Sequence, residues 1–422
     1  MARRALTPES AAELRRRVGA CLGCRALLRS SFAWPVLLPF YERFAGLSTA
    51  EALGLVAAFA FGRLAFAWPA RWIAGRSGRR MLLLAAGAGT AVGSGSILVG
   101  ATPLAFVLGE AVLGAAAAAG AVAVPGLLAA TLADFGQEED ESFLERRAQI
   151  VETGFALVTT ASSGVLLWMS TTAPYVLTLV MATAALTCAV LLDEPRARPA
   201  LPSARERRAA LRELGYVPAL ARAIVIGGLA AALSIAVRFA QQPYLEAVSG
   251  SVVWLGLVAA ATEILRFGVD SGAEDRQRKG GPALWMMLAA VPVFAMAAMR
   301  HVLVTPLLLL RGAENGLRRR DLDRVTTAVI APANRAAAED IAATTERAGE
   351  LVGAALLAGL AVAIGPSGGL AILGTGALVL AVVVAWLPTG PGRRKKGRVE
   401  EDELARESAE EIADQGVWRP RR

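Results

Sequence analysis

The sequence predicts an all-α polytopic membrane protein in which twelve membrane-spanning helices form two six-helix bundles. Hydrophobic residues make up 55% of the 422 residues, and the mean hydropathy is +0.49. The charged residues, 19% of the chain, are clustered, so long apolar stretches lie between them. A stretch of about 18 apolar residues can cross a bilayer as a helix, and it is too long for a strand of a membrane barrel.

The chain begins with a predicted amphipathic helix. Thr7, Pro8 and Glu9 are the N-cap, the first-turn proline and the early acid that favour a helix start. Arginines interrupt the apolar face that follows. We therefore expect residues 1–25 to lie on the cytoplasmic membrane surface.

Twelve apolar segments follow, and each is expected to be one span. Their bounds are about 26–43, 52–73, 81–101, 104–127, 149–170, 174–192, 218–242, 252–270, 283–299, 302–324, 346–364 and 369–387. Short gaps that are nearly free of Lys and Arg alternate with long, basic gaps. Because basic loops stay in the cytoplasm, both termini are predicted to lie there, in a multi-pass protein of the inner or plasma membrane. The net charge of +8 fits an anionic membrane surface better than nucleic acid.

The chain is predicted to consist of two related halves. A basic turn follows the second span of each half, and LGEAVLG at 108–114 matches LRGAENG at 310–316. Such internal repeats are typical of secondary transporters. The predicted parts are the segment 1–25, the bundle 26–192, the cytoplasmic linker 193–217, the bundle 218–388 and the charged cytoplasmic tail 389–422.

The basic turn of the first half carries a family resemblance. Residues 71–80 read RWIAGRSGRR, which resembles the Gly-x-Leu-Ala-Asp-Arg-x-Gly-Arg-Arg turn of the major facilitator superfamily. In that family the aspartate helps to close the cytoplasmic side, and Gly75 stands in its place here. The resemblance implies a cytoplasmic gate formed by Arg76, Gly78, Arg79 and Arg80, together with Asp275 and Arg276 from a degenerate second copy.

Charged side chains inside the spans are candidates for the transport pathway, because the bilayer tolerates them only when they are paired or hydrated. The candidates for the substrate or proton pathway, with the amides near them, are Arg63, Glu110, Arg238, Gln241, Gln242, Glu263, Glu314 and Asn315. The alternative is a structural role as ion pairs. Glu263 and Arg266, three residues apart, are the strongest case for that alternative.

Three further features have two interpretations each. Asp321 and Arg324 are an inner gate pair or part of a solvated helix end. Pro243 is expected to break the helix beside Gln241 and Gln242, which then face the cavity or only end a helix. The tryptophans at three predicted span ends are interpreted as interfacial residues rather than as ligand platforms; they are Trp34, Trp68 and Trp285.

The resemblance implies a secondary active transporter that works by alternating access. Proton-coupled export of a small solute is favoured, with Glu314 as the first choice for the proton-carrying residue. The expected partners are the solute, protons and the lipid bilayer, and the protein is expected to be a monomer. No metal, cofactor or nucleic acid is expected.

Several alternatives remain open. One alternative is an uncoupled facilitator or uptake permease. Another is a membrane sensor or scaffold that does not transport. Enzyme activity is not expected. Residues 365–369 satisfy G-x-S-x-G and His301 is the sole histidine, but a serine hydrolase needs that motif between a strand and a helix.

Overall fold

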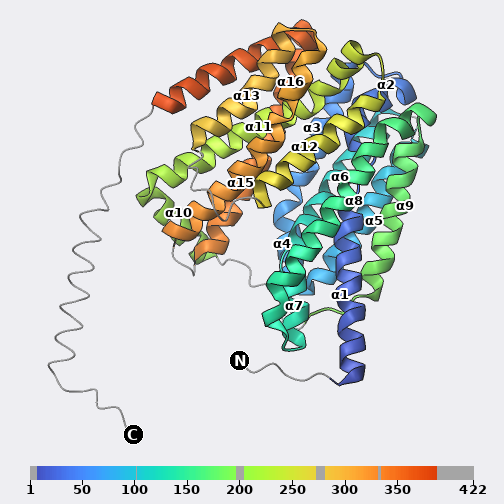
Figure 1. Ribbon diagram of the computed structural model, residues 1–422, viewed down its shortest axis with the longest axis vertical. Helices are drawn as coiled ribbons and strands as arrows, with labels where there is room; N and C mark the ends of the chain where they lie inside the picture. The colour runs from blue at the N-terminus through green and yellow to red at the C-terminus, as the bar shows by residue number, and fades with distance from the viewer. Residues whose placement is uncertain (1–6, 101, 196–203, 272–280, 331–333, 387–422) are drawn as a thin grey trace, which may run out of the picture.

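The computed structural model describes residues 7–100, 102–195, 204–271, 281–330 and 334–386. Within these ranges the chain is helical and contains no strand, which confirms the predicted all-α class. Figure 1 shows long helices that run roughly side by side between two ends of the molecule. The first group comprises α1 (Pro8–Arg29), the 3₁₀ turn η1 (Trp34–Val36), α2 (Leu37–Ala45), α3 (Thr49–Ala65), α4 (Ala67–Ser77), α5 (Arg79–Val99), α6 (Pro103–Ala123), α7 (Leu127–Asp134), the 3₁₀ turn η2 (Glu138–Asp140), α8 (Glu141–Met169) and α9 (Ala173–Leu191).

A shorter second group follows the segment between α9 and α10. It comprises α10 (Ala204–Tyr216), α11 (Pro218–Ser249), α12 (Val253–Ser271), α13 (Pro282–Ala298), the 3₁₀ turn η3 (Val302–Val304), α14 (Thr305–Leu308), α15 (Leu310–Val329) and α16 (Arg335–Trp386). α16 is two helices joined at Gly365, whose φ of 79° and ψ of 160° interrupt the helix. The predicted hairpin between the last two spans lies at this break.

Every predicted span overlaps a helix of the structure. Within the described residues, seven helices are long and apolar enough to cross a membrane, and the shorter apolar helix Pro282–Ala298 adds another segment. The first of the seven, Thr49–Ser77, combines α3 and α4. Helices α12 and α15 carry several charges within their predicted spans, and these charges belong to the site described below.

Two expectations about local structure are wrong. Residues 8–29 form one helix in which Cys21 and Cys24 are fully buried, so the boundary predicted at residue 25 lies inside α1. The chain then bends through η1 into α2. Pro243 does not break its helix, because α11 continues through it to Ser249.

The repeat is visible in the way that helices pack. In each group a helix at the fourth-span position packs on one at the second-span position: α6 on α3, and α15 on α12. Glycines allow the close approach. A Cβ on Gly114 would lie 2.0 Å from the carbonyl oxygen of Phe59, and one on Gly312 would lie 2.2 Å from that of Thr262. The matched segments 108–114 and 310–316 therefore share a packing role.

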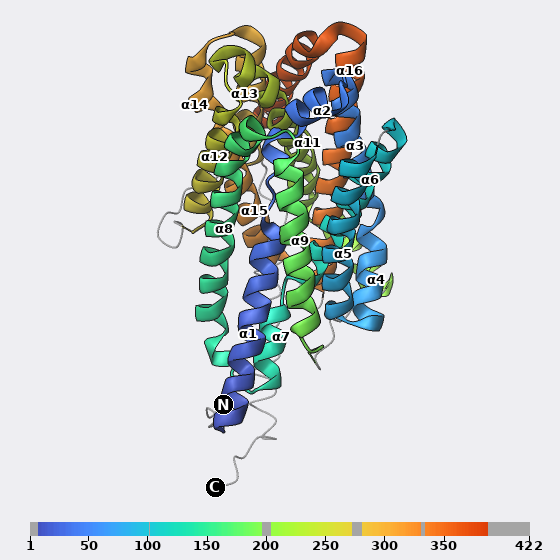
Figure 2. The same cartoon turned by 90° about the vertical axis from the view of Figure 1, so that its right-hand side faces the viewer.

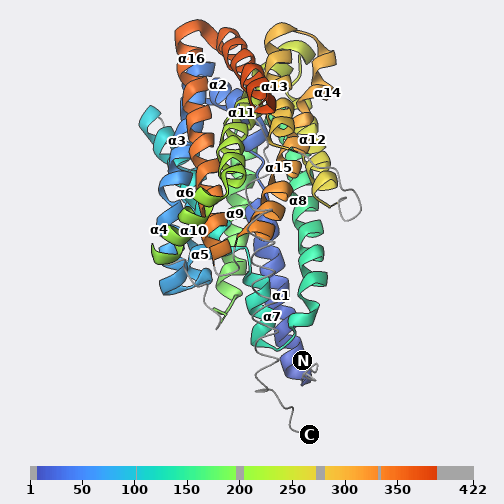
Figure 3. The same ribbon diagram turned by 90° about the vertical axis from the view of Figure 1, so that its left-hand side faces the viewer.

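The two ends of the molecule differ, and we name them by their connections. The hairpin end carries α2 (Figure 1) and α14 (Figure 2), and the linker end carries α7 and α10 (Figure 1). Figures 2 and 3 show the same division from the two sides. At the hairpin end one apolar core contains residues of both groups, including Leu38, Phe239 and Leu255.

At the linker end the core is divided. One cluster contains only residues of the first group, such as Leu82 and Leu128. The other contains only residues of the second group, such as Trp285 and Leu322. The apolar core therefore joins the two groups at the hairpin end but not at the linker end.

Candidate functional site

A polar pocket lies between the two groups of helices, next to the shared core. Its cavity volume is about 50 Å³. Apolar side chains from η1, α3 and α11 form one part of its wall, and charged and amide side chains form the other. The lining residues are Trp34, Phe59, Arg63, Ala231, Ser234, Ile235, Arg238, Asn315, Arg318 and Glu350. Of the predicted pathway residues, the structure thus brings together Arg63, Arg238 and Asn315.

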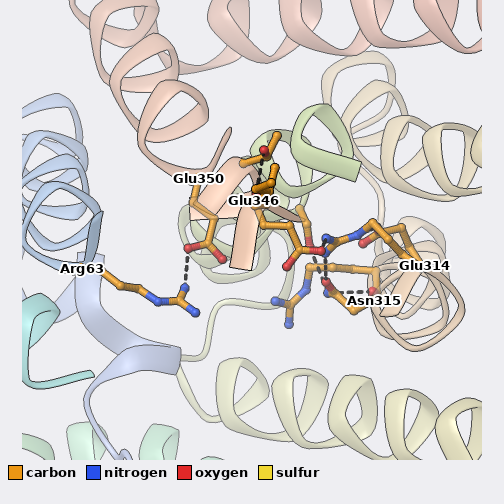
Figure 4. A network of polar contacts seen from close by, with 10 residues as sticks. Arg63, Glu314, Asn315, Glu346 and Glu350 are labelled. Atoms are coloured by element: carbon orange, nitrogen blue, oxygen red, sulfur yellow. Dashed lines mark hydrogen bonds and ion pairs between the residues drawn. The ribbon is translucent and has the colours of Figure 1, made fainter. Parts of the chain in front are cut away.

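Arg63 forms an ion pair across the pocket. Its Nη1 contacts a carboxylate oxygen of Glu350, 287 residues further along the chain. Figure 4 shows the two side chains pointing toward one another from α3 and α16. Sequence reasoning missed Glu350, because it lies in the first turns of the predicted span 346–364 and resembles a helix-end charge. Its only signal was a third charge in the segment ERAGE, residues 346–350.

Glu314 lies beside the pocket and is fully buried. It accepts a hydrogen bond of 2.6 Å from Nε of Arg318, and its second carboxylate oxygen has no hydrogen-bond partner. Arg318 also pairs with Glu346 and donates a bond of 2.8 Å to Asn315. Asn315 in turn donates a bond of 3.0 Å to Ser234. The charge of Glu314 is thus linked to the pocket wall through Arg318 (Figure 4).

Glu110 lies apart from the pocket, inside the first group. It is fully buried and accepts hydrogen bonds of 2.8 Å from the hydroxyls of Tyr41 and Tyr175. Its other oxygen has no hydrogen-bond partner. No arginine or lysine of the described residues forms an ion pair with it. Tyr41 belongs to α2, so this buried carboxyl touches the hairpin-end core.

Glu263 has the partner that the structural alternative predicted. Nε of Arg266 lies 2.8 Å from its carboxylate, and Nη2 of Arg29 lies 3.6 Å away. Arg29 belongs to α1, so the second contact links the two groups of helices. Arg29 also lies 3.7 Å from Glu152. Glu263 therefore belongs to a network of ion pairs rather than to the pocket lining.

The two glutamines predicted to face the cavity lie between the pocket and the hairpin end. Gln242 is fully buried. Its Oε1 accepts a bond of 2.9 Å from the backbone of Leu38, and its Nε2 donates a bond of 3.0 Å to the carbonyl of Trp34. Gln242 thus fastens α11 to the break between η1 and α2. Gln241 is also buried, but its Oε1 has no partner.

The basic turn that carries the family motif is held by backbone contacts. Gly78 has a φ of +94°, and the carboxylate of Glu194 accepts hydrogen bonds of 2.7 Å from the backbone N–H groups of Arg79 and Arg80. The Arg79 side chain donates to the carbonyl of Pro125, and that of Arg80 donates to the carbonyl of Val190 at 3.0 Å. These residues brace the first group internally. The guanidinium of Arg76 lies 5.4 Å from the ring of Trp72.

Arg71, at the start of the same turn, does cross to the other group. It forms an ion pair with Asp340 of α16, and Arg207 of α10 lies 3.4 Å from the same carboxylate. The side chains of Arg71 and Asp340 are only 14% and 11% exposed. In the superfamily motif a glycine stands at position 71 and an aspartate at position 75. The structure thus places a cross-group ion pair four residues before the missing aspartate.

Other gate residues have different outcomes. Asp321 lies 3.6 Å from Arg320 and accepts a bond of 3.2 Å from the indole of Trp285. No ion pair among the described residues joins it to Arg324, which is exposed, so the interpretation of Arg324 as part of a solvated helix end fits better than the gate pair. Asp275 and Arg276 lie outside the described residues.

Of the three tryptophans interpreted as interfacial, one is exposed. Trp68 is 59% exposed. Trp34 lines the pocket, and Trp285 is buried against Asp321, so both interpretations as interfacial residues are wrong. The break between α1 and α2 turns Trp34 toward the pocket. No pattern in the sequence predicted that break.

The comparisons with known proteins support the fold. The sequence matches no protein-family model and no curated protein. The structure is similar to an auto-inhibited POT family peptide transporter (TM-score 0.70, 12% identity, 90% of this chain and 98% of the other). It is also similar to the nucleoside transporter NupG (0.65, 12%, 88% and 97%).

A third similar structure is a D-xylose-proton symporter, with a TM-score of 0.63 and 15% identity over 91% of this chain and 98% of the other. At such low identity the likeness is one of fold. The resemblance carried by the basic turn and the two matched halves is thereby confirmed at that level: this chain has the all-α, multi-pass fold of the major facilitator superfamily.

Proposed function

We propose that this protein is a secondary active transporter that moves a small solute by alternating access. The observation that carries the proposal is the pocket's position. The shared core and Gln242 separate it from the hairpin end, whereas toward the linker end the two groups have separate cores. Rocking the groups about the pocket would expose it to each side in turn.

Proton coupling through Glu314 is part of this proposal. A proton taken up by the carboxylate removes its negative charge and so weakens its ion pair with Arg318. Because Arg318 lines the pocket, uptake and release of the proton would change the charge that a bound solute meets. Export is the proposed direction, by analogy with the superfamily.

Glu110 is a second candidate for the proton site, and one observation favours it. It is buried against two tyrosine hydroxyls with no cation in contact, and an isolated carboxylate is far less stable in such surroundings than a neutral carboxyl. Opening the hairpin end would separate α2 from α11 and admit water near Tyr41. That motion would couple the proton on Glu110 to the state of the hairpin end.

The test of alternating access uses a single thiol in the pocket. Ser234→Cys, in a protein whose Cys21, Cys24 and Cys188 are replaced, should react with membrane-impermeant reagents from either face of the membrane. Reaction from one face alone, across pH values and candidate solutes, would instead favour a sensor or scaffold. A cysteine at exposed Trp68 serves as the lipid-facing control.

Coupling is tested separately with Glu314→Gln and Glu110→Gln in proteoliposomes. The variant of the true proton site should lose accumulation driven by a pH gradient yet keep solute exchange, because exchange needs no net proton movement. An uncoupled facilitator would show no gradient-driven accumulation even in the unchanged protein.

A further inference from the structure

The charges between the two groups of helices do not balance. Each carboxylate near the pocket has a guanidinium partner: Glu350 pairs with Arg63, Glu314 and Glu346 pair with Arg318, and Glu263 pairs with Arg266. Glu152 is shared by Arg25 and Arg29. Among the described residues of this network, no carboxylate is without a cation.

Arg347 of α16 is 8% exposed, forms no ion pair among the described residues, and its Nη1 has no hydrogen-bond partner. Two further arginines, next to the pocket, also remain without an ion pair. Arg238 of α11 lines the pocket, and no ion pair or hydrogen bond joins it to any described residue; its guanidinium lies 5.4 Å from the ring of Trp34. Arg311 of the neighbouring α15 is 3% exposed, and its Nε and Nη1 have no hydrogen-bond partner. Glu263 acts on both arginines at longer range, as do Glu350 on Arg238 and Glu314 on Arg311, but none of these carboxylates forms an ion pair with them.

Unpaired arginines at this depth call for a ligand of opposite charge. A guanidinium stays protonated even when it is buried, so it cannot remove its charge as a lysine or histidine does. Burying such a charge without a partner is strongly unfavourable. The planar fork of the group matches the two oxygens of a carboxylate or phosphate.

The other residues of the pocket wall indicate the chemical nature of the rest of the ligand. Trp34, Phe59 and Ile235 offer an apolar and aromatic surface beside Arg238. Trp34 and Phe59 pack edge to face with ring centroids 4.3 Å apart, so the platform is preorganised. Ser234 of α11 and Asn315 of α15 supply neutral hydrogen-bonding groups.

We propose that the pocket binds an organic anion whose carboxylate or phosphate group pairs with Arg238, while its apolar part lies on Trp34 and Phe59. Arg311 stabilises the same negative charge from behind the pocket wall. Arg63 and Arg318 keep their own carboxylates and set the shape of the site. This inference rests on the proposed function and adds to it a substrate class.

The first experiment needs no knowledge of the solute. Arg238→Met should raise the melting temperature of the purified, ligand-free protein by about 2–4 °C, because it removes a partly buried positive charge that has no ion-pair partner. Arg63→Met, which breaks the ion pair with Glu350, should lower it. Arg300→Gln, at an exposed loop position, is the neutral control. A fall in melting temperature with Arg238→Met would overturn the proposal, since it would mean that Arg238 already has a structural partner.

The second experiment fixes the ligand class with probes that differ only in their head group. Benzoate, phenyl phosphate, benzyl alcohol and benzylamine are compared on the purified full chain by thermal stabilisation, with inorganic phosphate as a further probe. The two aromatic anions should stabilise the protein by about 2 °C or more at saturation, and Arg238→Gln should abolish the shift. An equal shift from the alcohol or the amine, no shift from either anion, or anion shifts that survive Arg238→Gln would contradict the assignment.

The experiments can contradict the transport proposal and the anion-binding proposal independently of each other. Anion binding that depends on Arg238, in a protein whose pocket thiol reacts from one face only, would leave the ligand class intact and remove transport. A pocket open to both faces that binds neutral or cationic probes would leave transport intact and remove the anion.

Discussion

The hairpin end and the linker end join the same two groups of helices in different ways. At the hairpin end a continuous apolar core, with Phe239 and Leu38 fully or almost fully buried, spans both groups, and Gln242 adds two hydrogen bonds across the junction. At the linker end each group keeps its own core, and the ion pair of Arg71 with Asp340 crosses between them, while Arg207 contacts the same carboxylate from the second group.

This difference affects the free-energy cost of separating the two groups of helices at each end. Separating an apolar core exposes its whole contact area to water, and that cost grows with the area. The ion pair of Arg71 with Asp340 is largely buried, but opening the linker end would hydrate both charges, and that hydration offsets part of the lost interaction. The structure is therefore closed toward the hairpin end by an apolar core, and at the linker end the two groups are joined by a buried ion pair instead of a shared apolar core.

The largest expected effect comes from the shared core. Phe239→Ala should destabilise the closed hairpin end by about 3–5 kcal/mol, the usual cost of removing a buried phenyl ring. Thermal unfolding and the reactivity of a thiol near Gln242 would measure it. Phe294→Ala, at a 43% exposed position, is the matched control and should change both little. Equal effects of the two substitutions would mean that the core is not the hairpin-end closure.

An intermediate effect is expected at the linker end. Asp340→Asn should cost about 2–3 kcal/mol of cross-group interaction, because it leaves the half-buried Arg71 and Arg207 facing each other without an anion. Linker-end thiols should become more reactive while hairpin-end thiols do not. Asp193→Asn breaks a pair with Arg17 inside the first group and should leave the linker-end opening unchanged. If it opens the linker end to the same extent, the pair of Arg71 with Asp340 is not a latch.

The smallest expected effect concerns neighbouring amides. Gln242→Leu removes two hydrogen bonds to backbone groups and should cost about 1–2 kcal/mol of hairpin-end stability. Gln241→Leu removes an oxygen that has no partner and should be nearly neutral. Chemical denaturation of the two variants compares them directly, and a reversed order would refute the role given to Gln242.

The fold was largely predictable from the sequence, because hydrophobic runs, basic gaps and the glycines of the two matched segments are local signals. Arg63, Arg238 and Asn315 were found for a similar reason, since a polar residue inside an apolar run stands out. The break that turns Trp34 into the pocket was not predictable. It depends on Gln242, 208 residues away, which bonds to the backbone at the junction of η1 and α2.

The pairings across the pocket could not be predicted either. Glu350 is separated from Arg63 by 287 residues, and a single sequence holds no record of which distant charges meet. Arg71 stands where the family motif has a glycine, and that departure alone does not reveal its partner. Arg71 forms an ion pair with Asp340 of the other group. The role of a charged residue depends on the groups around it, and these are known only from the structure.

The most direct measurement is a pair of distances in one membrane-embedded protein. Spin labels at Leu104 and Arg300 report the hairpin end, and labels at Ala133 and Ala328 report the linker end. On addition of a stabilising anion or a change of pH, alternating access predicts that one distance shortens as the other lengthens. Two distances that stay fixed, or that change in the same direction, under every condition would contradict it.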